Sequence, residues 1–228
     1  MGSSEDTLRD HLRQHTQCLF GKSAALYCCP PITEQEGLEV GLPRVAAEFQ
    51  QFLRNGGDLE FDAFIVEFTD GGAGRSLDAL CSTVRSLFEF LSDHDPAGGA
   101  CMRAKVDSPD WLFSFGDCKF YPIALAPCYA AESSRFNYGH TSTVILFQPV
   151  AAFERRHEPG GESIPSRLRE QIRRAFHCKG QEYNLNITLG PCECFRVIKP
   201  LRNNDALVRW WEAPLYTDSH NLALDDKG

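Results

Sequence analysis

The sequence predicts a single α+β domain with a largely antiparallel sheet flanked by helices. Residues 111–115, 120–126 and 142–147 have the apolar and aromatic composition of strands, and they lie together in the middle of the chain. Segments with helical periodicity precede and follow them. Strands grouped in one stretch, with helices on both sides, are typical of α+β proteins rather than of alternating α/β folds.

Helices are predicted on the N-terminal side of these strands. Residues 3–17 can form a short helix, and Pro43 is well placed to begin a second helix that ends near Leu53, after a loop over residues 37–41. Residues 75–91 form the clearest amphipathic helix. Its apolar face consists of Leu77, Leu80, Val84, Leu87, Phe88 and Leu91.

Further elements complete the predicted domain. Residues 61–68 have the alternation of a strand, and Gly116-Asp117 predicts a hairpin turn between two of the central strands. A short helix is expected at Ala151, and Ser163 is expected to open a longer one that carries Leu168, Ile172 and Phe176 inward. Residues 195–198 are predicted to form a last short strand.

Composition excludes several classes of function. With 43% hydrophobic and 24% charged residues, the 228-residue chain has the balance of a folded globular protein. Its net charge of −8 argues against nucleic acid or an anionic membrane as the main partner. The polar N-terminus has no signal sequence, and no apolar run approaches the roughly 20 residues that span a bilayer, so a cytoplasmic protein with reduced cysteines is expected.

Local motifs alone do not identify a function. The chain contains no dinucleotide-binding glycine pattern, no P-loop and no nucleophile elbow, and its ten cysteines lack C-x-x-C spacing. His11 and His15 have the i,i+4 spacing of a metal site but no acidic partner in the pattern. His140 lies between Arg135 and a strand, where an imidazole is held rigidly, whereas His177 closes a helix, whose C-terminus favours positive charge.

Several segments taken in order resemble the YqcI/YcgG family. Residues 110–116 (DWLFSFG) and 120–127 (FYPIALAP) resemble its central hairpin. Further similar segments are Cys18–Lys22, which opens the domain, Ser134-Arg135, Leu146–Pro149, Phe153-Glu154, Gln171–Arg174, Gly190 with Glu193, and Trp211–Pro214. The resemblance places the family domain at residues 18–216, between a helical extension (1–17) and a flexible C-terminal tail (217–228).

The resemblance implies an activity, because characterised relatives are haem-dependent N-hydroxylases that act on arginine or a related guanidine. It implies haem b, oxygen or peroxide, an electron donor and a small amine, guanidine or amino-acid substrate, in specialised metabolism. Such an iron needs one protein ligand and one open position. Two alternatives remain open: a haem-binding or haem-sensing protein without turnover, and a small-molecule-binding relative without haem.

The resemblance also implies site residues. The expected proximal iron ligand is His140, with His177 as the second candidate. Arg135 is expected to anchor a carboxylate, either of a haem propionate or of the substrate, because a guanidinium binds carboxylates with two hydrogen bonds. The other expected cofactor contacts are Phe147, Gln148 and Arg173, and Glu193 is expected to contact the substrate.

Overall fold

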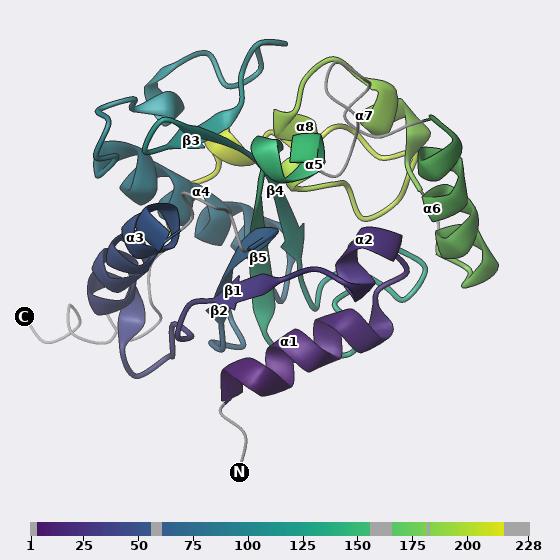
Figure 1. The fold of residues 1–228 in the computed structure, drawn as a ribbon, viewed down its shortest axis with the longest axis horizontal. Coiled ribbons are helices and arrows are strands. Elements are labelled where there is room, and N and C mark those ends of the chain that lie inside the picture. Colours follow the sequence, from purple (N-terminus) through teal and green to yellow (C-terminus); the bar gives the residue numbers. More distant parts are fainter. Residues whose placement is uncertain (1–3, 56–60, 156–165, 182, 217–228) are drawn as a thin grey trace, which may run out of the picture.

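A five-stranded sheet forms the centre of the computed structural model, which describes residues 4–55, 61–155, 166–181 and 183–216 (Figure 1). The strand order is β1-β2-β5-β4-β3. Only β1 and β2 pair in parallel; the other three pairings are antiparallel, which confirms the predicted α+β class. The strands are β1 (Leu26–Cys28), β2 (Ala63–Phe68), β3 (Phe113–Phe115), β4 (Cys118–Leu125) and β5 (Thr143–Pro149).

Helices cover both faces of the sheet. In Figure 1, α3 and α4 lie to one side of the strands, whereas α1, α2 and α6 lie to the other. The helices are α1 (Ser4–His15), α2 (Leu19–Lys22), α3 (Gly37–Asn55), α4 (Leu77–Asp93), α5 (Val150–Arg155), α6 (Ser166–Cys178), α7 (Leu185–Leu189) and α8 (Cys194–Val197), with 3-10 turns η2 (Cys101–Arg103) and η3 (Trp210–Glu212).

The turn between β3 and β4 has the predicted hairpin geometry. Gly116 and Asp117 have φ angles of +56° and +60°. Two consecutive residues at positive φ form a type I′ turn, whose twist matches that of the flanking strands. Phe115 consequently pairs with Cys118 across the turn. The three predicted central strands are neighbours in one sheet, as expected.

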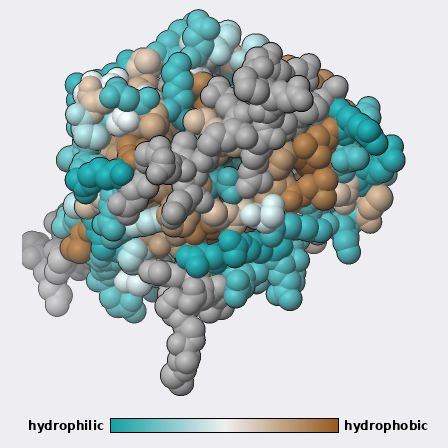
Figure 2. Space-filling model, in the orientation of Figure 1, coloured by the Kyte–Doolittle hydropathy of each residue, from teal (hydrophilic) through white to brown (hydrophobic). Residues whose placement is uncertain are grey.

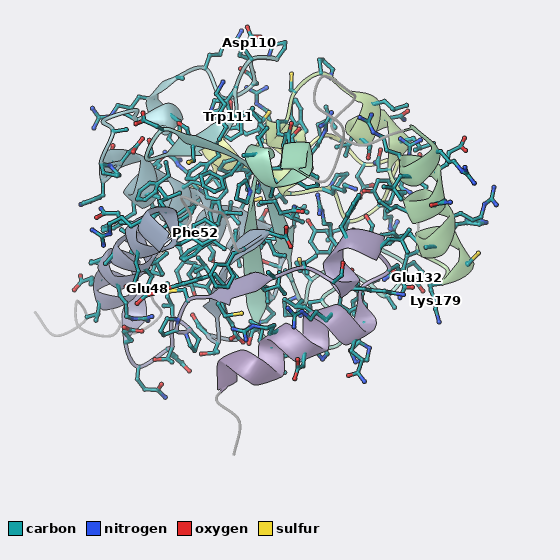
Figure 3. All side chains as sticks on the ribbon, in the orientation of Figure 1. Glu48, Phe52, Asp110, Trp111, Glu132 and Lys179 are labelled. Atoms are coloured by element: carbon teal, nitrogen blue, oxygen red, sulfur yellow. The ribbon has the colours of Figure 1, made fainter. Side chains whose placement is uncertain are left out.

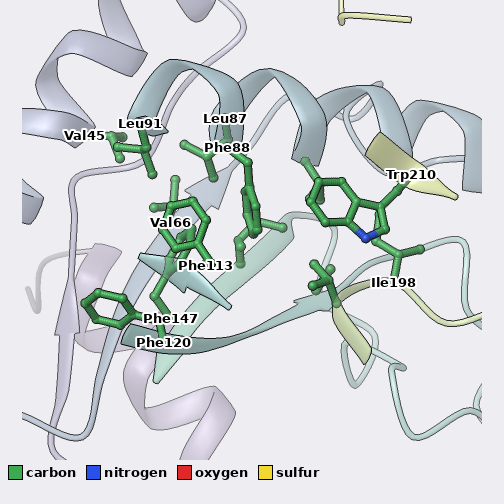
Figure 4. Close-up of a cluster of buried hydrophobic side chains, with 14 of the residues drawn as sticks. Val45, Val66, Leu87, Phe88, Leu91, Phe113, Phe120, Phe147, Ile198 and Trp210 are labelled. Atoms are coloured by element: carbon green, nitrogen blue, oxygen red, sulfur yellow. The ribbon is translucent and has the colours of Figure 1, made fainter. Parts of the chain in front are cut away.

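The main hydrophobic core lies between the sheet and helices α3 and α4. The ring of Phe49 from α3 stacks on Phe64 of β2, with centroids 4.3 Å apart. The ring centroid of Phe88 from α4 lies 5.2 Å from that of Phe147 of β5, and both side chains are fully buried (Figure 4). The predicted amphipathic face of α4 therefore packs on the sheet, as the helical spacing of its apolar residues indicates.

A smaller core lies on the opposite face. Leu8 and Leu12 of α1 pack there with Ile65 of β2 and Val144 of β5, and all four are buried. Helix α1 is therefore packed against the sheet. Because both faces of β2 are covered, all six of its residues are buried, a pattern usual for strands in the interior of a sheet.

Two of the predicted local elements are wrong. Residues 37–41 begin helix α3 instead of forming a loop, and Pro43 lies inside this helix. Residues 195–198 do not form a strand, because Cys194–Val197 is a helix. Cys194, Val197 and Ile198 are all fully buried. Cys194 and Val197 have the i, i+3 spacing of one helix face, and Ile198 follows the helix in an extended conformation. Ser163 and the tail 217–228 lie outside the described residues.

The surface is mixed in polarity. Figure 2 shows a face on which hydrophilic residues predominate, with hydrophobic side chains visible between them. In Figure 3, Phe52 and Trp111 lie among the side chains of the interior, whereas Asp110, Glu132 and Lys179 lie at the edge of the molecule. Within the described part of the chain, no helix has both the length and the hydrophobicity to cross a bilayer.

Replacing Phe147 with alanine should lower the free energy of unfolding by about 3–5 kcal/mol, the range for truncating a buried aromatic side chain. The ring contacts Phe49, Phe88 and Phe113, so its loss leaves a cavity in the core. Urea denaturation followed by circular dichroism measures the change. The control is Leu189→Ala, at a side chain 67% exposed, where the change should stay within about 0.5 kcal/mol. Equal effects of the two substitutions would contradict this account of the core.

Candidate functional site

A cavity of about 390 Å³ lies on the face of the sheet opposite α3 and α4. Its volume is within the range of small-molecule sites. Its floor consists of side chains from four strands: Leu26 (β1), Ala63 (β2), Ile123 and Leu125 (β4), and Leu146 (β5). Helices α1, α2, α5 and α6 and the segment 183–199 provide the walls. The cavity therefore depends on elements from nearly the whole chain.

One end of the cavity is apolar and aromatic. The ring of Phe153 from α5 meets Phe20 of α2 and Tyr121 of β4 edge to face, at centroid distances of 6.4 and 5.6 Å. All three line the cavity, together with Ile172 of α6. Such a surface suits the body of a flat or apolar ligand and excludes water from it.

The other end contains a buried arginine that has no acidic partner among the described residues. Arg135, on the loop after β4, is only 8% exposed. Its Nη2 donates to the backbone oxygen of Arg196, whereas its Nε has no hydrogen-bond partner in the described structure. None of the described carboxylates lies within ion-pair distance of Arg135. Burial lowers the pKa of its guanidinium, although three tyrosines (Tyr183, Tyr129 and Tyr138) and Glu193 act in the opposite direction.

Arg196 of α8 is compensated by an acid. Its Nη1 lies 2.5 Å from Oε2 of Glu193, and its Nη2 donates to the backbone oxygen of Gly190 at 2.8 Å. Burial raises the pKa of Glu193, and Arg196 and Arg135 partly offset this effect. The charges of Glu193 and Arg196 therefore balance each other, while Nε of Arg196 has no partner among the described groups.

A buried lysine completes the cationic end. Lys199 is 6% exposed and lines the cavity. Its Nζ donates to Oγ of Ser134 at 3.2 Å and lies 4.5 Å from the ring centroid of Tyr183. No carboxylate of the described residues forms an ion pair with it. Burial, and next the nearby charges of Arg135 and Arg196, hold the pKa of Lys199 well below its usual value. Its amine is therefore easily deprotonated.

The two histidines that the resemblance favours do not line the cavity. His140 lies before β5, where its Nδ1 accepts from the backbone N–H of Ser142 at 3.3 Å and lies 3.9 Å from Oε1 of Glu67. The ring centroid of His140 lies 5.2 Å from that of His11 of α1. The ring centroids of His11 and His15 are 4.6 Å apart. Within the described residues, no group of three or more His, Cys, Asp or Glu side chains could hold a metal ion. His177 is exposed at the end of α6.

Of the other expected contacts, Arg135, Gln148, Arg173 and Glu193 line the cavity. Phe147 instead lies in the main core on the opposite face, because neighbouring residues of a strand point to opposite sides of the sheet. Two cationic side chains of the cavity, Arg196 and Lys199, were not predicted from the sequence. Glu193, Arg196 and Lys199 follow one another at intervals of three residues, which could have indicated a helical turn with three charged side chains on one side. The strand predicted over residues 195–198 hid this pattern.

Lys199→Met should stabilise the protein, because an apolar side chain of similar length replaces an amine that is costly to bury in its charged form. The folded-state pKa of Lys199 lies below its unfolded value near 10.5. At pH values between these two pKa values, the unfolded chain therefore binds more protons than the folded protein. In that window Lys199 makes wild-type stability rise with pH by up to about 1.4 kcal/mol per pH unit.

The gain from Lys199→Met should therefore be largest below the lowered pKa and shrink as pH approaches 10.5. Thermal or urea unfolding of both proteins at several pH values measures it. A gain that does not depend on pH would show that the buried amine does not titrate as described. Lys119→Met, at an exposed position on β4, is the matched control.

Comparison with known proteins places the chain in a family. A search of curated proteins and a search of solved structures each find no significant match. A sequence model of the YqcI/YcgG family matches residues 10–186, which is more than half of the chain. The match begins inside α1 and extends into α7, so it includes β1 to β5 and much of the cavity. The chain therefore belongs to the YqcI/YcgG family.

Proposed function

We propose that the cavity binds a small molecule through its negatively charged group, and that the protein acts as a haem-dependent N-oxygenase. The observation that carries the binding proposal is Arg135, a buried guanidinium without an acidic partner among the described residues, at the wall of the cavity. An uncompensated buried charge costs several kcal/mol of stability. An anion bound against Arg135 would offset this cost.

The residues that line the cavity suit the charge and the apolar surface of haem b. Its two propionates would lie against Arg135, Arg196 and Lys199, where two guanidinium Nε atoms have no partner in the described structure. The macrocycle would lie over the apolar strand residues, beside Phe20 and Phe153. Bound haem would supply the oxygen activation that hydroxylation of an amine or guanidine nitrogen requires.

The cavity lining favours a different iron ligand from the one expected. Cys18 and three tyrosines line the cavity, and both thiolate and phenolate serve as axial ligands of haem. Burial raises the pKa of Tyr138 and of Tyr183, which disfavours their phenolate forms. We therefore place Cys18, at the start of α2, ahead of His140 as the proposed ligand.

The second candidate is a small-molecule-binding protein without haem. The cavity, about 390 Å³, is at the lower end of the range for ligand sites, and no histidine lines it in the described structure. An anionic metabolite smaller than haem would satisfy Arg135 equally well. Haem binding without turnover is the third possibility, and an activity assay separates it from the first.

Titration with ferric haem, followed by absorption spectroscopy, tests the cofactor. The wild-type protein should give a Soret band, and Arg135→Lys should weaken haem binding by about 1–3 kcal/mol, the value of a charge-assisted hydrogen bond. Arg103→Met is the matched control, because that side chain is 75% exposed in η2. Unchanged affinity in Arg135→Lys would remove Arg135 from the site, and a colourless wild-type protein would favour the candidate without haem.

The iron ligand can be tested with two substitutions in the same titration. Cys18→Ser should shift or abolish the Soret band, because a hydroxyl is a much weaker ligand than a thiolate. His140→Ala should leave the spectrum unchanged, because His140 is outside the cavity lining. The reverse pattern would restore His140 as the ligand. Oxidation of an amine or guanidine substrate by the haem-loaded protein with peroxide, or with a reductant and oxygen, tests the N-oxygenase activity itself.

A further inference from the structure

The charges of the described residues at the cationic end of the cavity do not balance. Arg196 is neutralised by Glu193. Arg135 and Lys199 have no carboxylate within ion-pair distance in the part of the chain that the structure describes, and both are more than nine-tenths buried. Arg169 and Arg173 of α6 also line the cavity, but they are only half-buried, so solvent screens their charge. Two buried cationic groups therefore lack a counter-charge among the residues that the structure describes.

The two groups respond differently to an empty cavity. The guanidinium of Arg135 stays charged at any ordinary pH. Lys199 can instead lose its proton. Burial is the main cause of its lowered pKa, and repulsion from Arg135 and Arg196 comes next, so both favour the neutral amine. A negative charge close to Nζ would reverse both effects and raise the pKa again.

Among the described residues, the immediate surroundings of Nζ contain no group that could supply this negative charge. The charged and titratable groups around Lys199 are Arg135, Arg196, Glu193, Tyr183 and Tyr129. Glu193 is held by Arg196, and burial raises the pKa of both tyrosines, which therefore stay neutral. The hydroxyl of Tyr129 donates to the backbone oxygen of Lys199 at 2.8 Å, so it fixes the chain without adding charge.

We infer, resting on the binding function proposed above, that this end of the cavity accepts a group with two negative charges and that Lys199 takes up one proton when the ligand binds. One charge pairs with Arg135 and the other with the ammonium of Lys199, and Nε of Arg196 provides a further donor. A phosphate-like dianion or two carboxylates of one ligand have this chemistry in common. A single carboxylate does not compensate both cations.

Proton uptake makes the affinity depend on pH. The complex holds one proton more than the free protein, so the dissociation constant rises with pH. The rise begins above the lowered pKa of free Lys199 and approaches tenfold per pH unit. It ends at the pKa that Lys199 has in the complex. Below the lowered pKa, Lys199 is protonated in both states and this dependence disappears.

Isothermal titration calorimetry with sulfate tests the inference, because sulfate is a dianion that does not titrate in this range. Binding measured at one pH in Hepes and in Tris, which differ in ionisation enthalpy, gives the number of protons taken up. Wild-type protein should take up close to one proton at a pH between the lowered pKa of free Lys199 and the pKa of Lys199 in the complex. It should bind sulfate at least tenfold more tightly than nitrate, a monoanion, at equal ionic strength.

Variants identify the group that takes up the proton. Lys199→Met should bind sulfate at least tenfold more weakly and without proton uptake, whereas Lys119→Met should behave as wild type. Lys199→Arg carries a permanent charge, so any binding it retains should be independent of pH. Thermal unfolding of each variant verifies that it is folded. Proton uptake that persists in Lys199→Met, or equal affinity for sulfate and nitrate, would overturn the inference.

A parallel titration distinguishes the two sources of the dianion and separates this inference from the proposed function. Ferric haem b and its dimethyl ester differ only in the two carboxylates. A strong preference for the free acid, with proton uptake at Lys199, would indicate the bis-carboxylate source. Haem that binds equally well as its ester would leave the cofactor proposal standing and overturn the dianion. Sulfate binding with proton uptake, but without any Soret band on addition of haem, would support the dianion site and overturn the cofactor proposal.

Discussion

Alternation of side chains along β5 decides which residues enter the aromatic core and which reach the cavity. Phe147 points toward α3 and α4, whereas Leu146 and Gln148, its neighbours, line the cavity on the other face. A one-residue shift in register would exchange these two sets. The pairing of β5 with β2 on one side and β4 on the other holds the register, so the large core on one face stabilises the geometry of the site on the other.

The buried cations on the cavity face of the sheet destabilise the fold, and the hydrophobic core on the other face offsets this loss of stability. Burying Arg135 and Lys199 without acidic partners among the described residues is unfavourable, and it persists only because the surrounding structure holds these side chains in place. Arg135 is held through the backbone oxygen of Arg196, and Lys199 through Ser134 and Tyr129. Unfavourable arrangements of this kind are common at functional sites, where a ligand supplies the missing partner.

The sequence was sufficient to predict the class of fold and the central elements, because their signals are local. The type I′ turn at Gly116-Asp117 and the apolar face of α4 each depend on residues close in the chain. The sequence did not reveal β1, a strand of three residues whose pairing with β2 depends on distant segments. The resemblance pointed to Arg135, Gln148, Arg173 and Glu193, which line the cavity, whereas Arg196 and Lys199 were not predicted, because residues 195–198 were expected to form a strand. Whether a buried charge lacks a partner is a property of the packed chain, and no local pattern contains it.

Helix α1 links the histidine cluster to the cavity. On its buried side, Leu12 lines the wall of the cavity, and Thr16, which directly follows the helix, lines it as well. On its other side, His11 and His15 lie against the loop that carries His140. Burial lowers the pKa of His11, the hydrogen bond with the backbone of Asn137 partly offsets this effect, and repulsion from His15 and His140 lowers the pKa further, so the neutral form of His11 is favoured. The helix that was expected to be an extension of the domain is therefore one wall of the site, and hydrophobic contacts of Leu8 and Leu12 hold it against the sheet.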